Sequence, residues 1–336
     1  MNDAEEALGP GVSIVIPVRD RLDLLARCLS SLRRLRQADV ELVVVDDGSR
    51  EIPQPGADAT LVTLSRPRGF AGAANAGAAA AHGEYVAFVN SDVEVEEQWL
   101  HELVAALERH GRAAAVTGKL LRADDRRVLD GAGDAMTLAL KAYRRGQGER
   151  DSGQYEREEE VFSAAGTASL WRRDVFHSLG GFDESFGSYY EDVDLGFRAR
   201  LAGFECWYTP RAVAYHVGGA SGGDARRDLD AMYAVRNRWA TVIKSAPAGW
   251  LLAAAPVLAV GEIASLARAL ATQDLRRSMR AYRVLFRMRA HLLAERREIA
   301  ATRVARHRDL LRVVDGVFPP LYTSLWRFRT RPRNTP

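Results

Sequence analysis

The sequence has few of the features that mark secreted, zinc-binding or membrane-spanning chains. Only two cysteines occur, Cys28 and Cys206, which excludes a disulfide framework and zinc-ligand spacing and is typical of a reducing compartment. The opening residues, MNDAEEALGPG, are acidic where a secretory signal needs a basic and then an apolar segment, so export is not expected. The apolar run between Lys244 and Glu262 contains Pro256 and is short for a bilayer span. These absences favour a cytoplasmic protein whose cysteines are core thiols.

Charge is distributed unevenly along the chain. Residues 244–336 contain 17 Arg and one Lys against six acids, a net charge of +12, whereas the whole chain carries +3. The rest of the chain therefore carries −9. The chain is 47% apolar and able to bury a full core, and residues 262–314 have the pattern of long basic amphipathic helices. We expect a catalytic domain over residues 1–245 and a helical basic extension over residues 246–336.

Short β-branched runs alternate with helical patterns in the first part of the chain. Leucines at helical spacing fill residues 22–35, between the first two runs. This alternation predicts a doubly wound α/β sheet, whose ligand crevice lies at the carboxyl ends of the strands. Residues 141–160 are charged, rich in glycine and almost free of apolar side chains, which predicts a mobile surface loop. Buried strands are predicted at 12–18, 40–49, 59–65 and 84–92.

Acidic and amide side chains follow two of these strands. Asp46 and Asp47 come after the second run, and Asn90 and Asp92 come after the fourth. Taken alone, each group is typical of a turn or a helix cap. Together, at the carboxyl ends of neighbouring strands, their oxygens suit a hard divalent cation that bridges a diphosphate. Asp92 is accordingly predicted to be a metal ligand.

The segment YYEDVDLGFRARLAG predicts a helix from about residue 191 to residue 202. Asp194 and Arg198 fall on one helix face and are expected to form an ion pair in solvent. Asp192 points elsewhere and, at a helix start, can act as a general base on a substrate hydroxyl. His216 follows an apolar strand and precedes VGGASGG, a stretch whose backbone can approach a phosphate. A structural histidine and a metal ligand are both open there, and we favour the ligand.

Seven motifs follow one another along the chain: VSIVIPV, VVVDDGS, GFAGAANAG, FVNSDV, GGFDESF, YYEDVDLGFR and AYHVGGAS. In this order they resemble family 2 glycosyltransferases with the GT-A fold, over about residues 11–240. The resemblance is greatest to rhamnosyltransferase-like and galactofuranosyltransferase-like members. It implies an inverting, metal-dependent transfer of a sugar from a nucleoside-diphosphate donor to a hydroxyl of a lipid-linked or glycan acceptor, in cell-envelope polysaccharide synthesis. The leading donor is dTDP-rhamnose.

The resemblance also implies roles for single residues. Asp192 matches the catalytic base, and Glu191 a residue that orients the site or touches the acceptor. Asp92 matches the last acid of the Asp-x-Asp motif and His216 a further metal ligand, so Mg²⁺ or Mn²⁺ is the implied cofactor. Asn90, a substrate-binding position, stands where that motif has its first acid, so one carboxylate is missing. The other residues implied to contact the donor are Pro17, Asp46, Asp47, Arg68, Gly69, Phe70, Asn75 and Gly77.

Other classes of function fit parts of the pattern. A non-catalytic nucleotide-sugar-binding scaffold at the membrane would keep the same fold, but Asp192 and His216 favour the enzyme. A dinucleotide-dependent oxidoreductase is set aside because the first strand ends in PVRDRLDLL and not in Gly-x-Gly-x-x-Gly. The Gln-x-x-Arg-Trp motif of processive synthases is also absent; RNRW at 236–239 resembles only its end. A single sugar addition per encounter is favoured.

The basic extension predicts where the protein works. A basic amphipathic helix can lie on an anionic membrane surface, so we expect a cytoplasmic protein held peripherally on the inner face of the cell membrane. Packing of the same helices between protomers of a homo-oligomer is the alternative. No nucleic-acid partner is expected, because no recognised motif or aromatic platform accompanies the arginines.

Overall fold

The structure is a computed structural model that describes residues 11–35, 39–218, 224–271 and 275–316. Three stretches used in the predictions lie outside these residues. They are residues 1–10, residues 219–223 of the glycine-rich stretch after His216, and residues 317–336 of the basic extension.

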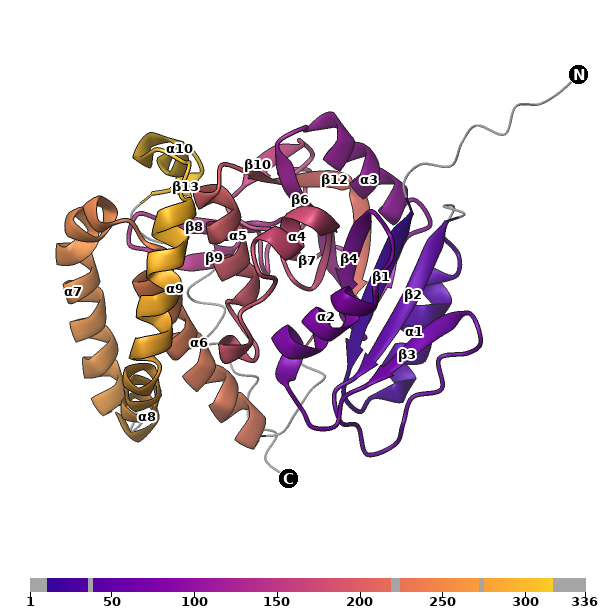
Figure 1. The fold of residues 1–336 in the computed structure, drawn as a ribbon, viewed down its shortest axis with the longest axis horizontal. Helices are drawn as coiled ribbons and strands as arrows, with labels where there is room; N and C mark the ends of the chain where they lie inside the picture. Colours follow the sequence, from indigo (N-terminus) through magenta and orange to yellow (C-terminus); the bar gives the residue numbers. More distant parts are fainter. Residues whose placement is uncertain (1–10, 36–38, 219–223, 272–274, 317–336) are drawn as a thin grey trace, which may run out of the picture.

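The centre of the fold is a mixed β-sheet with strands in the order β10-β12-β6-β11-β4-β1-β2-β3 (Figure 1). Strands β1 to β4 run parallel, as their buried β-branched sequences predict, and β11 is antiparallel to both β4 and β6. The α/β fold predicted from the alternation of strands and helices is confirmed. The strands are β1 (Val12–Val18), β2 (Val40–Asp46), β3 (Ala59–Thr63), β4 (Tyr85–Val89), β6 (Ala113–Arg122), β10 (Glu159–Val161), β11 (Ala168–Arg172) and β12 (Glu205–His216), with β5 (Val93–Val95) beside β12 and β7 (Leu129–Gly131) beside β6.

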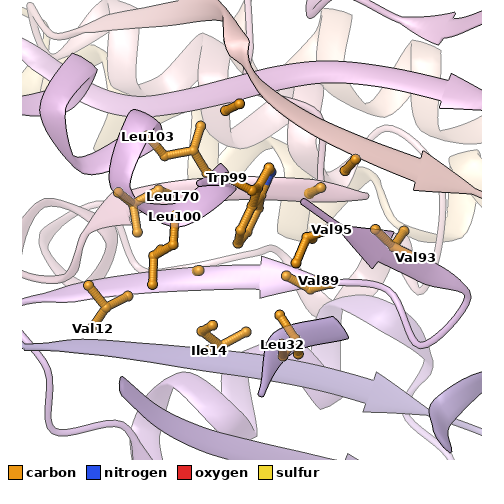
Figure 2. Packing of buried hydrophobic residues seen from close by; sticks show 14 of the residues in the cluster. Val12, Ile14, Leu32, Val89, Val93, Val95, Trp99, Leu100, Leu103 and Leu170 are labelled. Carbon is orange, nitrogen blue, oxygen red and sulfur yellow. The ribbon is translucent and has the colours of Figure 1, made fainter. Parts of the chain in front are cut away.

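Helices cover both faces of the sheet. On one face α1 and α3 pack on the strands, and Figure 2 shows Leu100 of α3 beside Val12 and Ile14 of β1, with Trp99 and Leu103 in the same cluster. On the other face α2, α4 and α5 pack through a second cluster of small and aromatic side chains. Helices α1 and α3 bury one apolar stripe against the sheet, whereas α5 is buried almost all round. These helices are α1 (Leu22–Leu32), α2 (Gly69–Ala80), α3 (Trp99–Arg109), α4 (Arg173–Ser178) and α5 (Glu191–Leu201).

Both cysteines are core thiols, as predicted. Cys28 on α1 and Cys206 on β12 are fully buried and free. Burial raises the pKa of the Cys206 thiol to about 11 and raises that of Cys28 further, so both stay protonated at neutral pH.

Residues 141–160 are only in part the loop that their composition predicts, and its predicted mobility stays a prediction. They contain β9 (Ala142–Arg144) and β10, and β9 joins a small sheet in the order β13-β8-β9, with β8 at Asp134–Thr137 and β13 at Val314–Asp315. Their charges are paired; Lys119 Nζ lies 3.0 Å from Asp151 Oδ2, for example. Strands of three residues are too short to show an alternating pattern, so periodicity did not reveal them.

The C-terminal helices pack directly on the sheet domain. Helix α6 lies between α5 and α9 (Figure 1), and Phe197 of α5 shares a hydrophobic cluster with Trp250 of α7 and Leu310 of α10. The predicted boundary at residue 245 coincides with the end of α6, and a division into two units there stays a prediction, because one apolar cluster crosses it. The helices are α6 (Asp224–Ser245), α7 (Ala248–Ala271), α8 (Leu275–Arg287), α9 (Arg289–Thr302) and α10 (His307–Leu311).

Helix α7 is longer than the apolar run in the sequence indicates, because it continues past Glu262 to Ala271. Glu262 is turned toward neighbouring helices, where its carboxylate accepts hydrogen bonds from Arg238 Nη1 at 2.8 Å, Trp239 Nε1 at 3.2 Å and the Tyr282 hydroxyl. By length and composition α7 is able to cross a membrane, a test that core helices of soluble proteins also pass. The prediction that this run is too short to span a bilayer is therefore wrong for the helix, which has 24 residues.

Candidate active site

The carboxyl ends of β1, β2 and β4 lie side by side because these strands are parallel neighbours. Pro17, near the end of β1, is level with Val45 of β2, one residue before Asp46. The Asp46 carboxylate is buried, and its Oδ1 accepts a hydrogen bond from Ser49 N at 2.9 Å. Asp46 therefore shapes the turn after β2, and a contact of Pro17 or Asp46 with a nucleotide stays a prediction.

Asp47 fixes the start of α2. Its Oδ1 accepts from Arg68 N at 2.5 Å and its Oδ2 from Gly69 N at 2.9 Å. Burial raises the pKa of Asp47, and the two backbone donors partly offset that rise. Both carboxylate oxygens thus hold the segment that is predicted to close on the donor, which places Asp47 behind that segment.

The start of α2 is also fastened to residues 182–187. Gly69 has φ of +73°, and a Cβ there would lie 2.7 Å from the carbonyl oxygen of Gly187, so only glycine fits. Arg68 forms an ion pair with Glu184, and the Phe70 ring meets Phe182 edge to face at 5.5 Å. Arg68, Gly69 and Phe70 therefore lie together at the predicted donor edge.

Asn75 and Gly77 face into the protein. Asn75 Nδ2 donates to Phe182 O at 2.7 Å, and Asn75 Oδ1 accepts from Phe182 N at 2.9 Å. A Cβ on Gly77 would lie 2.2 Å from Val15 Cγ1, so this glycine lets α2 approach the sheet. Both residues have a structural contact here, and their predicted contact with the nucleotide stays a prediction.

A carboxylate and an imidazole meet where β12 ends. His216 Nε2 lies 3.4 Å from Asp92 Oδ1, because β12 pairs with β5 so that His216 is opposite Val93. Sequence reasoning missed the next residue: His216 Nδ1 lies 2.8 Å from Asp130 Oδ2, and Asp130 is 86 residues away in the chain. Metal-binding histidines commonly donate their other ring nitrogen to a carboxylate in this way.

Electrostatics hold a proton on this imidazole while no cation is bound. Burial alone would lower the pKa of His216, but the carboxylates of Asp130 and Asp92 outweigh it and raise the pKa to about 9. Burial likewise opposes ionisation of Asp130, yet its hydrogen bond with His216 and the charge of Arg144 lower its pKa to about 2. A cation bound by His216 would have to displace this proton, because only the deprotonated ring nitrogen binds a metal.

The donor set fits a divalent cation with two protein ligands. An oxygen of Asp92 and a nitrogen of His216 are close enough to share one ion, and Asp130 fixes the imidazole behind them. Within the described ranges no group of three or more His, Cys, Asp or Glu side chains is arranged to hold a metal ion. The remaining ligands would come from a diphosphate and water. Asn90, in place of an acid, supplies no charge.

Asp192 is the second residue of α5. Its Oδ2 accepts from Gly166 N at 2.8 Å, and its Oδ1 accepts from Val193 N at 2.8 Å. Thr167, the residue after Gly166, accepts a hydrogen bond from Asn90 N through its carbonyl oxygen at 2.9 Å. The predicted base and the predicted metal side are therefore joined by two consecutive residues.

Glu191, beside the base, is buried and its Oε2 has no hydrogen-bond partner among the described atoms. Burial, and then the charge of Asp192, raise the pKa of Glu191 well above its ordinary value. Burial and the neighbouring Asp192 therefore both disfavour a negative charge on Glu191.

The ion pair predicted between Asp194 and Arg198 is present, with Arg198 Nε 2.9 Å from Asp194 Oδ2. The predicted solvent exposure was wrong, because both side chains are buried. Arg198 also donates to the carbonyl oxygens of Leu179 and Gly181, at 2.5 and 2.7 Å. The Asp194–Arg198 pair therefore links α5 to the preceding loop at Leu179 and Gly181 and does not lie on the protein surface.

The sequence profile of Glycosyl transferase family 2 matches residues 13–180, half of the chain. The chain belongs to this family. A mannosyltransferase from Pyrobaculum calidifontis, solved with GDP-Man and Mn2+, superposes with a TM-score of 0.53 at 21% identity over 87% of each chain, which shows the shared GT-A fold.

Several relatives of this family 2 glycosyltransferase carry functional names. The chain is 32% identical to an O-antigen biosynthesis protein of Myxococcus xanthus, over 63% of this chain and 18% of that protein. It is 29% identical to an N-acetylglucosaminyl-diphospho-decaprenol L-rhamnosyltransferase of Mycobacterium tuberculosis, over 62% of this chain and 76% of that protein. The aligned part of the chain spans only 28%, 18% and 42% of the length of three relatives that it matches, among them the O-antigen biosynthesis protein.

Arg144 joins the two sides of the glycosyltransferase site, and sequence reasoning missed it too. Its guanidinium donates to Asp130 Oδ2 at 2.9 Å and to Thr167 Oγ1 at 3.1 Å. Burial opposes its charge, but Asp130, Asp134 and Asp192 together raise the pKa of Arg144. The only available signal was an arginine in residues 141–160, where the charged composition indicated a loop.

Proposed function

We propose that this family 2 glycosyltransferase moves a sugar from a nucleoside-diphosphate donor to a hydroxyl of a lipid-linked or glycan acceptor, with inversion at the anomeric carbon. The observation that carries the proposal is the link from Asp192 through Gly166 and Thr167 to Asn90 and the Asp92–His216 pair. The candidate base and the candidate cation site thus contact two consecutive residues, Gly166 and Thr167.

The leading donor is dTDP-rhamnose, with UDP-linked hexoses next. Support comes from the names of two relatives, one an L-rhamnosyltransferase of a diphospho-decaprenol acceptor and one an O-antigen biosynthesis protein. Both names also favour an acceptor of the cell envelope, and the first favours a lipid-linked one.

In the proposed reaction the Asp192 carboxylate accepts the proton of the acceptor hydroxyl. The acceptor oxygen forms its bond to the anomeric carbon while the bond from that carbon to the diphosphate oxygen breaks on the opposite face, through an oxocarbenium-like transition state. The donors of Gly166 and Val193 orient the carboxylate. Of the other acids in the first turn of α5, Asp194 is paired with Arg198, and burial disfavours the charged form of Glu191.

Asp92 and His216 would hold Mg²⁺ or Mn²⁺, and Asp130 would keep the imidazole turned toward the ion. When bound, such an ion offsets the negative charge of the departing nucleoside diphosphate. Because Asn90 replaces an acid, we expect a weaker site than one with two carboxylates.

The test is Asp192→Asn, with Asp174→Asn as matched control. Asp174 also lies in the first turn of a helix and its Oδ1 accepts from the next backbone nitrogen, Val175 N, at 2.7 Å, but it is remote from the site. We expect Asp192→Asn to lower kcat about 10²–10⁴-fold, the usual worth of a general base, while nucleotide affinity stays within about twofold. Asp174→Asn should keep both. Equal turnover by Asp192→Asn would refute the assignment.

A donor panel separates the enzyme from a scaffold. The wild-type protein is assayed for transfer and for donor hydrolysis with dTDP-rhamnose, UDP-hexoses and GDP-sugars, each with Mn²⁺ and with chelator. Transfer from one group of donors supports the proposal. Metal-dependent nucleotide binding without transfer or hydrolysis would favour the non-catalytic scaffold.

The proposed place of work is the inner face of the cell membrane, with α7 and α8 on the lipid surface. Leu252 is 77% exposed on α7, and Ile263 and Leu270 are 68% and 63% exposed. Because Glu262 is turned inward, the outward face of α7 carries no charged side chain among those described. This face lies at the end of the molecule farthest from β3 (Figure 1).

Charge favours an anionic bilayer over a second copy of the chain. The exposed arginines of α8 include Arg280 and Arg283, and the α8 sequence contains no acid. Lipid phosphates complement this charge, at about 1 kcal/mol for each basic residue near the surface. A two-fold dimer through the same surface would instead bring like charges together.

Vesicle sedimentation tests the membrane proposal. We expect binding to phosphatidylglycerol-containing vesicles at low salt and little binding to phosphatidylcholine alone. The double variant Arg280→Glu/Arg283→Glu should lose at least about tenfold in partitioning, given the roughly 1 kcal/mol for each residue. The control Arg34→Glu/Arg112→Glu makes the same charge change on the sheet domain and should bind normally. A wild-type protein that ignores anionic vesicles and sediments as a dimer would refute the proposal.

A further inference from the structure

The backbone just before the proposed base has an unusual shape. Gly187, Tyr189 and Tyr190 all have φ of 70°, in the left-handed region. Tyrosine disfavours this region, because its Cβ crowds the backbone, so neighbouring groups must hold residues 186–190 in place. The segment leads directly into Glu191 and Asp192 at the start of α5.

Two side chains of α6 hold this segment from one side. Asn237 Nδ2 lies within hydrogen-bond distance of three carbonyl oxygens, those of Phe186 at 3.1 Å, Ser188 at 2.9 Å and Tyr189 at 2.6 Å. Arg236 Nη2 donates to Phe186 O at 2.6 Å and, at 3.0 Å, to the oxygen of the residue before it. Arg236 Nε donates to Asn237 Oδ1 at 2.7 Å, so the pair forms one unit.

Arg236 and Asn237 are both buried, so losing one of their hydrogen bonds would leave a buried carbonyl oxygen without a donor. Asn237 is fully buried and Arg236 is 7% exposed, so water cannot replace the donors if a side chain is removed. Outside the pair, the hydrogen bonds of the two side chains go to the main chain of residues 185–189. Their contact is therefore with the shape of the backbone and not with particular side chains.

The predicted donor segment holds the same residues from the other side. Ala71 N, in the first turn of α2, donates to Gly187 O at 3.0 Å, and Gly69 packs against the same carbonyl. Residues 186–190 thus lie between the start of α2, beside Arg68, and the buried pair of α6. Displacing them would shift the base relative to the donor.

We propose that Arg236 and Asn237 are positioning residues of the transferase site, which hold residues 186–190 so that Asp192 faces the reacting sugar. This inference rests on the function proposed above. It gives the Arg-Asn of the RNRW stretch a structural role, since both side chains bind main-chain carbonyl oxygens inside the protein.

The test compares Asn237→Ala and Arg236→Lys with the control Arg238→Ala. Arg238 is the next residue on α6 but reaches Glu262 of α7, away from residues 186–190. We expect Asn237→Ala to lower kcat about 10–100-fold, the effect of misplacing a catalytic group by about 1 Å, with donor KM within about twofold. Arg236→Lys keeps the charge and should lose less. Arg238→Ala should keep the wild-type kcat.

Hydrogen exchange gives a readout that does not need activity. Amides of residues 183–195 should exchange faster in Asn237→Ala than in wild type, and at the wild-type rate in Arg238→Ala. Wild-type exchange or wild-type kcat in Asn237→Ala would overturn the inference, as would an equal loss of kcat in Arg238→Ala. If Asn237→Ala does not fold, Arg236→Lys decides by the same two measurements. If the wild-type protein uses no donor, the proposed function fails. Hydrogen exchange still tests the positioning role separately, because wild-type exchange of residues 183–195 in Asn237→Ala would overturn it.

Discussion

Replacing Gly77 by alanine tests how α2 is seated on the sheet beneath the donor segment. A methyl group there would lie 2.2 Å from Val15 Cγ1 and 2.9 Å from Val45 Cγ2, well inside van der Waals contact. Both valines are fully buried and β-branched, so they cannot easily turn aside. Overpacking costs about 1–3 kcal/mol, and two overlaps argue for about 3. Alanine gains about 1 kcal/mol over glycine in a helix, so we expect the free energy of unfolding to fall by about 2 kcal/mol.

The control is the same substitution in another helix interior. A Cβ on Gly261 of α7 would meet no atom within 4 Å, so Gly261→Ala should raise the free energy of unfolding by about 1 kcal/mol through helix propensity alone. Urea unfolding followed by tryptophan fluorescence measures both variants beside the wild-type protein. The two substitutions are chemically identical, so the opposite changes expected in the free energy of unfolding come only from the surroundings of each glycine.

A Gly77→Ala variant as stable as wild type would refute this account of the packing. Calorimetry on the folded variant then measures nucleotide affinity, which tests the predicted contact between Gly77 and the nucleotide. Because the missing Cβ faces the sheet, we expect affinity to stay within about threefold. A loss of binding in a folded and otherwise stable variant would contradict that expectation and favour a direct contact.

Two further outcomes are expected. Asp130→Asn should weaken Mn²⁺-dependent nucleotide binding about 10–100-fold in calorimetry, because the carboxylate behind His216 is lost, whereas exposed Asp124→Asn should not; equal affinity in both would contradict the role of Asp130. Asp183→Asn should cost about 1.5–3 kcal/mol of unfolding free energy at pH 7, since buried Lys244 loses a charged partner at 2.6 Å and keeps Asp194 at 3.0 Å. Burial would raise the pKa of Asp183 but Lys244 lowers it further, so the wild-type advantage should be full above about pH 4 and shrink as the pH falls below it; urea unfolding that shows a pH-independent difference would count against this.

Local patterns sufficed for the elements that carry strong periodicity. The buried runs at 12–18 and 40–46 are β1 and β2, and the helix predicted from residue 191 begins at Glu191. Parallel strands buried on both faces need continuous β-branched runs, and an amphipathic helix needs apolar residues at fixed spacing, so both can be read without a structure. The family followed from the order of the motifs and is confirmed by the match over residues 13–180.

Local patterns failed where a short element depends on distant partners. Residues 141–160 appeared to be a loop because their strands have three residues and their charges are neutralised by side chains far along the chain, such as Lys119. Glu262 appeared to end an apolar surface, yet Arg238, Trp239 and Tyr282 turn it inward. In both cases composition described the residues correctly and the direction of their side chains could not be known.

The fold, the family and the candidate groups follow from residue type, spacing and order along the chain, so they could be predicted without a structure. Which of those groups contact one another became known only from the packing of strands and helices. Asp130 stands behind His216 across 86 residues, and Asn237 holds the carbonyls of residues 186–189 from another helix. Such pairs form when strands and helices pack. A hydrogen bond depends on the distance and direction between two atoms in space, which the separation of two residues along the chain does not reveal.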